Sequence, residues 1–372
     1  MLFRSGNKSS FVTSIIKLLG VDFDLKDLGL LHYFLGLQID YTSSGLFVHQ
    51  TKYASDLIKK FGMTDYKPCK TPSSPNSHLL PNDSPLLFDP TSYRGLVGAL
   101  QYLTFIRPDL SLVVQQACQH MSSTQNHLQA AKCILRYLQG TLHFGIAFTS
   151  SPISLSAYSD SDWAEDPMDR RSLTGMVLFF GNSPISWSAT KQDTVSRSST
   201  EAEYRALAST TAELYWIRML LHDFGLFLPH PPLLLCDNVS ALAIATNPVF
   251  HARTKHIEVD YHFVCEKVLR RDVMLKFIST HDQLANLFTK SLPSPRVNWL
   301  TSKLMWKFPI RLRGDENHSN TGSTGNPEHS NHEEEEGTPT ARTPTTNFIK
   351  TLSYRRLGKH KGKIKQNVTV SH

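Results

Sequence analysis

Residues 155–160, Leu-Ser-Ala-Tyr-Ser-Asp, form a short strand-like run that closes on an acidic residue. Two further strand-like runs follow at 176–180 and 185–189, and the apolar spacing then predicts a long helix over 200–224. The remaining elements alternate, with strands expected at 233–236 and 274–278 and helices at 239–245, 258–270 and 283–289. Three strands followed by alternating helices and strands predict an α/β fold, with a mixed sheet flanked by helices.

The residues before position 151 predict a small α-rich module with a few strands. A helical pattern over 11–19 precedes strand-like runs at 32–39 and 46–49, and Thr51 is expected to cap a helix that reaches Phe61. Six prolines between positions 68 and 90 indicate an extended connector. Three more helical patterns lie at 92–105, 109–121 and 127–139.

The composition of the 372 residues is typical of a folded protein with a basic surface. Hydrophobic residues make up 40% and charged residues 19%, and the net charge of +7 favours a polyanionic partner without selecting nucleic acid. The five cysteines lack any CxxC spacing, which argues against a disulfide framework and favours a reducing compartment. No apolar run approaches the roughly 18–20 residues of a membrane span, so we expect a soluble intracellular protein without a membrane partner.

Two acidic residues stand where strand-like runs end. Asp160 closes the first run, and Asp237 follows the run at 233–236. Because ligands gather at strand ends in α/β sheets, both carboxylates could face one site. The competing interpretation is that each Asp only caps the turn that follows it.

A third acidic residue, Glu203, lies on the apolar face of the predicted long helix. Helical spacing aligns Glu203 with the apolar positions 207, 214, 217 and 221, and that face should pack on the sheet. Glu201 falls on another face and is expected to be solvated, while fraying of the first turn is the competing account for Glu203. Three converging carboxylates would suit a hard cation such as Mg²⁺, and two such ions can clamp a phosphodiester during hydrolysis.

Several motifs in this order resemble one family closely. The run 158–164, Tyr-Ser-Asp-Ser-Asp-Trp-Ala, resembles the opening strand of the ribonuclease H domain of Ty1/copia retrotransposons. Segments of the same domain are matched at 171–175, 198–204, 236–238 and 253–258. Upstream, the segments 26–29 and 32–36 resemble the region that follows the polymerase catalytic strands in these elements, and the resemblance extends over residues 11–292.

The resemblance implies a fragment of a copia-type Pol polyprotein with a ribonuclease H-like mixed sheet, preceded by a small α-rich remnant of the reverse-transcriptase thumb and connection. It implies a reverse-transcriptase remnant at 1–66, a Pro-rich connector at 67–90, a helical connection at 91–150, a ribonuclease H-like domain at 151–292 and a disordered tail at 293–372. The tail expectation also follows from its polar composition.

The implied activity is hydrolysis of the RNA strand of RNA–DNA hybrids by two-metal-ion catalysis with Mg²⁺, or alternatively Mn²⁺. The implied catalytic and metal-binding residues are Asp160, Glu203, Asp237 and, in place of the family's usual fourth Asp, Asn286. An Asn offers a carbonyl oxygen but no charge, so Asn286→Asp is expected to lower the Mg²⁺ requirement. Other retroelement Pol products are further candidate partners.

No two Asp residues are adjacent in the chain, so we expect no polymerase activity.

Two alternatives to the ribonuclease H stay open. The first alternative is a catalytically inactive nucleic-acid-binding remnant of a degenerate element. The second is a scaffold retained by the host, whose tail carries the function.

The remaining candidate sites are weaker. A loose zinc-like spacing is present at His251, His256, His262 and Cys265, where a polar helix and its approach loop are the preferred interpretation. Inert burial is the preferred interpretation for Cys236, and core packing for Trp163, Trp187 and Trp216. Phosphate contact and solvated surface are equally favoured for Lys191, Arg197 and Lys255.

Overall fold

The computed structural model describes residues 9–22, 30–73, 84–121, 124–247 and 258–307. The matched segment at 26–29, most of the one at 253–258, and His251, Lys255 and His256 lie outside these ranges. Among the described helices, none is long and apolar enough to cross a membrane.

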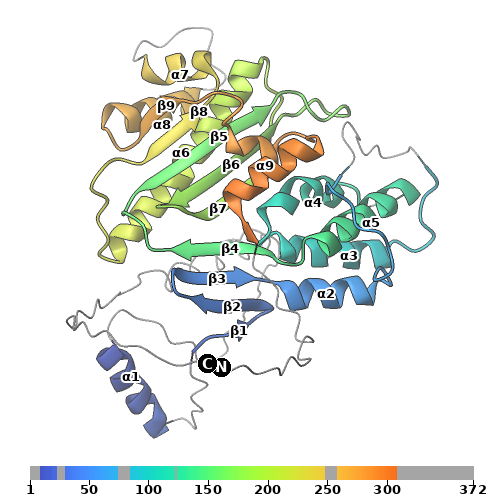
Figure 1. Ribbon diagram of the computed structural model, residues 1–372. Helices are drawn as coiled ribbons and strands as arrows, with labels where there is room; N and C mark the ends of the chain where they lie inside the picture. Colours follow the sequence, from blue (N-terminus) through green and yellow to red (C-terminus); the bar gives the residue numbers. More distant parts are fainter. Residues whose placement is uncertain (1–8, 23–29, 74–83, 122–123, 248–257, 308–372) are drawn as a thin grey trace, which may run out of the picture.

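The second half of the chain builds a five-stranded mixed sheet (Figure 1). Its strands are β5 (Leu155–Asp162), β6 (Leu173–Phe180), β7 (Ser183–Lys191), β8 (Leu233–Cys236) and β9 (Met274–Phe277). They lie in the order β7-β6-β5-β8-β9, in which β6 is antiparallel to both β5 and β7, while β8 is parallel to both β5 and β9. A three-stranded meander extended by two parallel strands confirms the predicted ribonuclease H-like sheet.

One long helix covers this sheet. Helix α6 (Ser199–Asp223) packs along β5 and β6, and α7 (Val239–Thr246) and α8 (Glu258–Leu269) pack against it. Its apolar face is fully buried at Leu207, Leu214, Ile217 and Leu221. The side chain of Ser198 caps the helix by accepting a hydrogen bond from the backbone N–H of Glu201 at 3.2 Å. The predicted closing helix is the 3₁₀ helix η3 (Leu284–Phe288).

The first half of the chain, completed by strand β10, forms an antiparallel sheet in the order β1-β2-β3-β4-β10. It is called the first sheet below, and the mixed sheet is called the second sheet. Its strands are β1 (Tyr33–Phe34), β2 (Leu37–Thr42), β3 (Gly45–His49), β4 (Phe144–Thr149) and β10 (Trp306–Lys307). The prediction of one strand over 32–39 is wrong, because Leu35 and Gly36 both have positive φ and reverse the chain there. Strand β4 lies in a region where only helices were predicted.

The helices of the first half that follow α1 share one apolar core. After α1 (Ser9–Asp22) come α2 (Thr51–Lys60), α3 (Thr91–Leu103), the 3₁₀ helix η1 (Pro108–Leu110), α4 (Ser111–Cys118) and α5 (Gln125–Gly140). The core includes Leu57, Leu100 and Leu135. The predicted cap of α2 is wrong: Gln50 takes the N-cap position, and the Thr51 hydroxyl donates to the carbonyl oxygen of Leu142 at 2.9 Å.

A buried ion pair lies at η1. Arg107 donates two hydrogen bonds to the Asp109 carboxylate, at 2.9 and 2.7 Å, and both side chains are almost fully buried. The hydroxyl of Tyr137 donates to the same carboxylate at 2.7 Å, and Arg107 also donates to the carbonyl oxygen of Thr141 at 2.9 Å. The pair therefore joins η1 to α5 and to the turn that leads into β4.

The predicted disorder from residue 293 onward is wrong for residues 294–307. Helix α9 (Ser294–Leu304) buries Val297, Leu300 and Leu304, whose spacing of three and four residues forms one apolar face. Strand β10 then pairs with β4, with Trp306 opposite Gly145. The chain thus returns to the first sheet after completing the second (Figure 1). Residues 308–372 lie outside the described residues, and the division of the chain into five segments stays a prediction.

Candidate active site

Asp160 and Asp237 lie at the same edge of the second sheet. The register pairs Tyr158 of β5 with Leu235 of the parallel strand β8. Two residues further along each chain, Asp160 and Asp237 therefore reach the same level at the carboxyl ends of the strands. Asp160 is fully buried and Asp237 is half-buried. This edge is where α/β sheets bind ligands.

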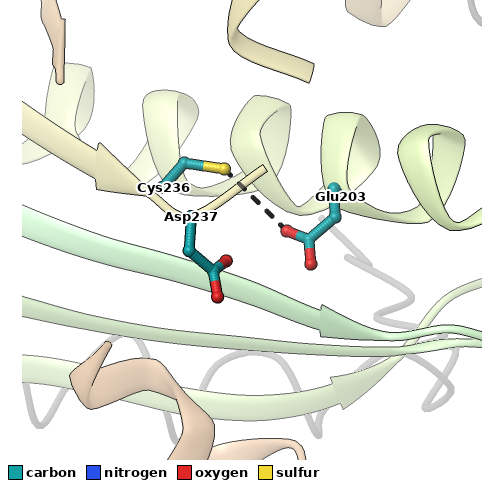
Figure 2. A group of neighbouring side chains, drawn as sticks. All are labelled: Glu203, Cys236 and Asp237. Carbon is teal, nitrogen blue, oxygen red and sulfur yellow. Dashed lines mark hydrogen bonds between the residues drawn. The ribbon is translucent and has the colours of Figure 1, made fainter. Parts of the chain in front are cut away.

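Glu203 comes to this edge from the first turns of α6. It faces the sheet, as its helical spacing predicts, and its side chain is 7% exposed. Ligand atoms of Glu203, Cys236 and Asp237 all lie within 4.8 Å of one another. Figure 2 shows the Glu203 and Asp237 side chains near the end of strand β8, with the Cys236 thiol directed at Glu203. The Cys236 sulfur lies 4.0 Å from a Glu203 carboxylate oxygen.

The segment around η3 closes the site and carries Asn286. The Asn286 amide donates to the carbonyl oxygen of Thr280 at 3.0 Å. The Thr280 hydroxyl in turn donates to Asp237 at 2.8 Å. Thr289 donates its hydroxyl proton to one oxygen of Asp160. The structure thus brings all four predicted residues to one place.

Sequence reasoning missed Lys290, which joins two of the predicted residues. Its ammonium nitrogen donates to Asp160 Oδ1 at 3.0 Å and to Asn286 Oδ1 at 2.7 Å. The available signal was its position four residues after Asn286, the spacing at which helical side chains meet. A lysine is so often solvated that this signal alone decides nothing.

The site contains more acidic side chains than cationic ones, and most of them are buried. Burial, together with the charges of Asp160 and Asp237, raises the pKa of Glu203 to about 9. Burial also raises the pKa of Asp160, against the opposing effect of Lys290. Burial alone would lower the pKa of Lys290, but the Asp160 carboxylate outweighs it and the pKa is raised. Such a cluster attracts positive charge.

Sequence relatives fit this geometry. The retrovirus-related Pol polyprotein from transposon RE1 of Arabidopsis thaliana is 44% identical over 302 residues, which cover 81% of this chain and 21% of that protein. The corresponding polyprotein from transposon TNT 1-94 of Nicotiana tabacum is 34% identical over 285 residues, 74% of this chain and 21% of that protein. This chain belongs to the Ty1/copia-type Pol polyproteins.

This chain, called the Pol segment below, spans about a fifth of the length of these polyproteins. Its residues 1–75 match the family described as reverse transcriptase (RNA-dependent DNA polymerase). An uncharacterized mitochondrial protein of Arabidopsis thaliana is 46% identical over 219 residues, 58% of the Pol segment and 90% of that protein. The Pol segment is therefore a retroelement region that joins a reverse-transcriptase-related part to a ribonuclease H-like fold.

Solved structures overlap with the Pol segment at low identity. A ribonuclease H1 isolated from compost by a metagenomic approach has a TM-score of 0.29 and 15% identity, covering 37% of the Pol segment and 92% of that chain. A foamy viral protease–reverse transcriptase in complex with double-stranded DNA has a TM-score of 0.40 and 11% identity, covering 78% and 45% of the two chains.

We expect Glu203→Gln to stabilise the Pol segment in the presence of EDTA, and increasingly so as the pH rises from 5 to 8. The folded pKa of about 9 exceeds the ordinary value of 4.5, so the folded state keeps a proton that the unfolded state has released. Stability of the wild type therefore falls across this interval, whereas Gln does not titrate. Thermal unfolding at several pH values measures the difference, and parallel pH profiles of the two proteins would contradict the expectation.

The prediction that Glu201 is solvated is wrong. Its side chain is only 5% exposed, and its two oxygens accept hydrogen bonds from the Arg205 guanidinium at 2.9 Å and from the backbone N–H of Arg197 at 2.9 Å. Glu201 thus has a cationic partner in direct contact, the guanidinium of Arg205. This pairing accounts for its burial and leaves it outside the carboxylate cluster.

The three tryptophans differ in their surroundings. Trp187 is buried and Trp216 is partly buried against the core, as predicted. For Trp163 the core prediction is wrong, because the ring is 46% exposed while its indole N–H donates to the carbonyl oxygen of Ser196 at 2.9 Å. An anchored and exposed ring lies three residues after Asp160.

The structure describes the surroundings of several of the other weaker candidates. Cys236 is fully buried, and burial raises its pKa, which fits an inert thiol. Lys191 forms salt bridges with Asp166 and Asp169, and Arg197 is exposed. Within the described ranges, the residues grouped closely enough to hold a metal are Glu203, Cys236 and Asp237, so the zinc-like spacing at His262 and Cys265 gains no support.

Proposed function

We propose that the Pol segment is a ribonuclease H that hydrolyses the RNA strand of RNA–DNA hybrids with the help of divalent metal ions. The observation that carries the proposal is the convergence of Asp160, Glu203 and Asp237 from β5, α6 and the end of β8. Three carboxylates at one buried edge do not stabilise the fold by themselves, because each ionised group increases the free energy required to ionise the others.

The donor set fits a hard divalent cation. Carboxylate oxygens are the preferred ligands of Mg²⁺, with Mn²⁺ as the alternative. Burial, followed by the charges of Asp160 and Asp237, raises the pKa of Glu203 to about 9, and a bound cation would oppose this shift by favouring the ionised carboxylate. Asp160, Glu203 and Asp237 would hold it, with Asn286 as a neutral oxygen donor. When bound, the ion would activate a water and neutralise charge at the scissile phosphodiester.

The residues around the carboxylates hold them in place and offer contacts for a hybrid. Thr280 fixes Asp237, and Thr289 fixes Asp160. Beside this edge, Trp163 presents an exposed aromatic face and Arg197 an exposed cationic group. A sugar or base can pack on such a ring, and an arginine suits a phosphate. Both are proposed hybrid contacts.

The test is cleavage of a hybrid whose RNA strand is labelled, by the full 372-residue chain with Mg²⁺ and with EDTA. Double-stranded DNA and double-stranded RNA of the same sequence serve as matched substrates. Metal-dependent cleavage confined to the RNA of the hybrid is the expected result. Absence of cleavage at every Mg²⁺ and Mn²⁺ concentration would reject the proposal.

Asn286 favours one second candidate, a nucleic-acid-binding remnant without catalysis. An amide at this position removes one negative charge from the site, and its carbonyl oxygen already accepts a hydrogen bond from Lys290. Such a remnant would bind the hybrid as tightly with EDTA as with Mg²⁺ and would leave it intact. Binding by fluorescence anisotropy, measured beside the cleavage assay, separates the two functions.

We expect no DNA synthesis by the 372-residue chain. Polymerisation by two metal ions requires closely placed acidic residues, and no two Asp residues are adjacent in this sequence. Incubation of the purified chain with a primed template and nucleotides measures the activity, and a complete reverse transcriptase is the positive control. Template-dependent extension by the Pol segment would contradict the expectation.

A further inference from the structure

Lys290 occupies a central position in the carboxylate site. Its backbone N–H donates to the carbonyl oxygen of Asn286 at 3.1 Å, so the turn that ends η3 fixes where the side chain starts. From there the ammonium reaches Asp160 Oδ1 at 3.0 Å and Asn286 Oδ1 at 2.7 Å. The side chain of Lys290 is only 33% exposed, and that of Asp160 is 1% exposed. The contact is therefore an inner part of the site.

The oxygens that Lys290 contacts are those that a second metal ion would need. Asp160 offers two oxygens, of which one accepts from Thr289 and the other from Lys290. Asn286 offers one oxygen, which accepts from Lys290, while its amide group is held by Thr280. Glu203, Cys236 and Asp237 form a group whose ligand atoms lie within 4.8 Å of one another, and this group includes neither Asp160 nor Asn286. The ammonium thus contacts Asp160 and Asn286 directly, whereas the carboxylates of Glu203 and Asp237 belong to the group that lies apart from this contact.

We propose that the Lys290 ammonium takes the place of one of the two metal ions, so that the Pol segment binds a single divalent ion beside Glu203 and Asp237. This inference rests on the proposed metal-dependent function. It reduces the metal ions to one and assigns Asp160 and Asn286 to the ammonium instead of to that ion. Lys290 is then a positioning residue, which holds Asp160 and Asn286 in fixed orientations.

The charges of the site favour one ion over two. Asp160, Glu203 and Asp237 supply three negative charges when ionised, and the ammonium cancels one of them. Two net negative charges are neutralised by one divalent ion. A second ion would leave two positive charges in excess within a few ångströms of one another, which is costly in a partly buried site.

Lys290 also changes the expected outcome of Asn286→Asp. A carboxylate at position 286 would pair with the ammonium that already lies 2.7 Å away. The single substitution should therefore leave the metal stoichiometry at one ion. Only its combination with Lys290→Met should free two carboxylates for a second ion, and the effects of the two substitutions should not add.

The experiment is calorimetric titration of the full chain with Mn²⁺ in the absence of nucleic acid. Five proteins are compared: the wild type, Asn286→Asp, Lys290→Met, the double variant and Lys276→Met as a control lysine on the exposed strand β9. We expect one bound ion for the wild type, for both single variants and for the control, and two for the double variant. Lys290→Met should keep one ion because Asn286 alone adds no charge.

Two bound ions in the wild type would overturn the inference, whatever the variants do. A second ion in Asn286→Asp alone, or no second ion in a folded double variant, would also overturn it, and so would the absence of any bound ion. Circular dichroism of each protein establishes folding. If a variant does not fold, the wild-type stoichiometry still decides between one ion and two.

Hybrid cleavage, measured separately, distinguishes this inference from the proposed function. One bound ion without cleavage at any metal concentration would reject the ribonuclease function. The inference that the Lys290 ammonium takes the place of one metal ion would still stand. Cleavage with two bound ions in the wild type would retain the ribonuclease and reject the role of Lys290.

Discussion

Replacing either Asp160 or Asp237 with Asn is expected to reduce hybrid cleavage by at least about a hundredfold, because removal even of residues that only support a metal ligand typically costs about 10- to 100-fold. Each substitution keeps the shape of the side chain and removes its charge. Asp160 can still accept the hydrogen bond from Thr289 as an amide, and Asp237 that from Thr280, so the fold should survive. Initial rates on a labelled hybrid measure the effect.

Glu201→Gln is the matched control for this loss. Its carboxylate pairs with Arg205 on α6, two residues from Glu203, and does not join the carboxylate cluster. We expect Glu203→Gln to remove cleavage and Glu201→Gln to leave it largely unchanged. The reverse pattern would show that the wrong face of α6 has been assigned to the site.

Asp109→Ala is expected to destabilise the chain by about 3–5 kcal/mol, the cost of removing one partner from a buried ion pair. The substitution would leave the Arg107 guanidinium buried, with its remaining hydrogen bonds only to Thr141, and would leave the Tyr137 hydroxyl without its acceptor. A loss of this size is a large fraction of the stability of a typical domain. Urea unfolding followed by circular dichroism measures it.

Tyr137→Phe provides the graded control. It removes a single hydrogen bond to the same carboxylate and leaves the ion pair intact, so its cost should be about 1.5–3 kcal/mol. If Asp109→Ala cost no more than Tyr137→Phe, the ion pair would contribute nothing beyond that one hydrogen bond.

The second sheet was predictable because its signals are local. The run at 233–236 is apolar and ends at an acidic residue, and strand β8 covers the same residues. In the first sheet, β4 pairs with β3, which lies about a hundred residues earlier in the chain. Residues 144–149 carry too weak a local preference to predict that strand, because strand formation depends on the partner.

The candidate site was predictable for those acidic residues whose position in a strand or helix is unusual. Asp160, Asp237 and Glu203 each had a position that set them apart, at a strand end or on an apolar face. Lys290 had no such mark, because its role depends on the fold of η3 against β5. Glu201 was assigned to solvent because it lies on a different helical face from Glu203, but that face is covered where the Arg205 guanidinium and the backbone N–H of Arg197 donate hydrogen bonds to the Glu201 carboxylate.

The pairing of β10 with β4 constrains the order in which this chain can fold during its synthesis. Strand β10 supplies the edge partner of β4, yet the whole of the second sheet is encoded between them. Residue 307 must therefore emerge from the ribosome before strand β10 can complete the first sheet. Until then the nascent chain exposes the free edge of β4, which is a surface for strand pairing with other chains. Early termination before α9 should consequently promote aggregation of the shortened product.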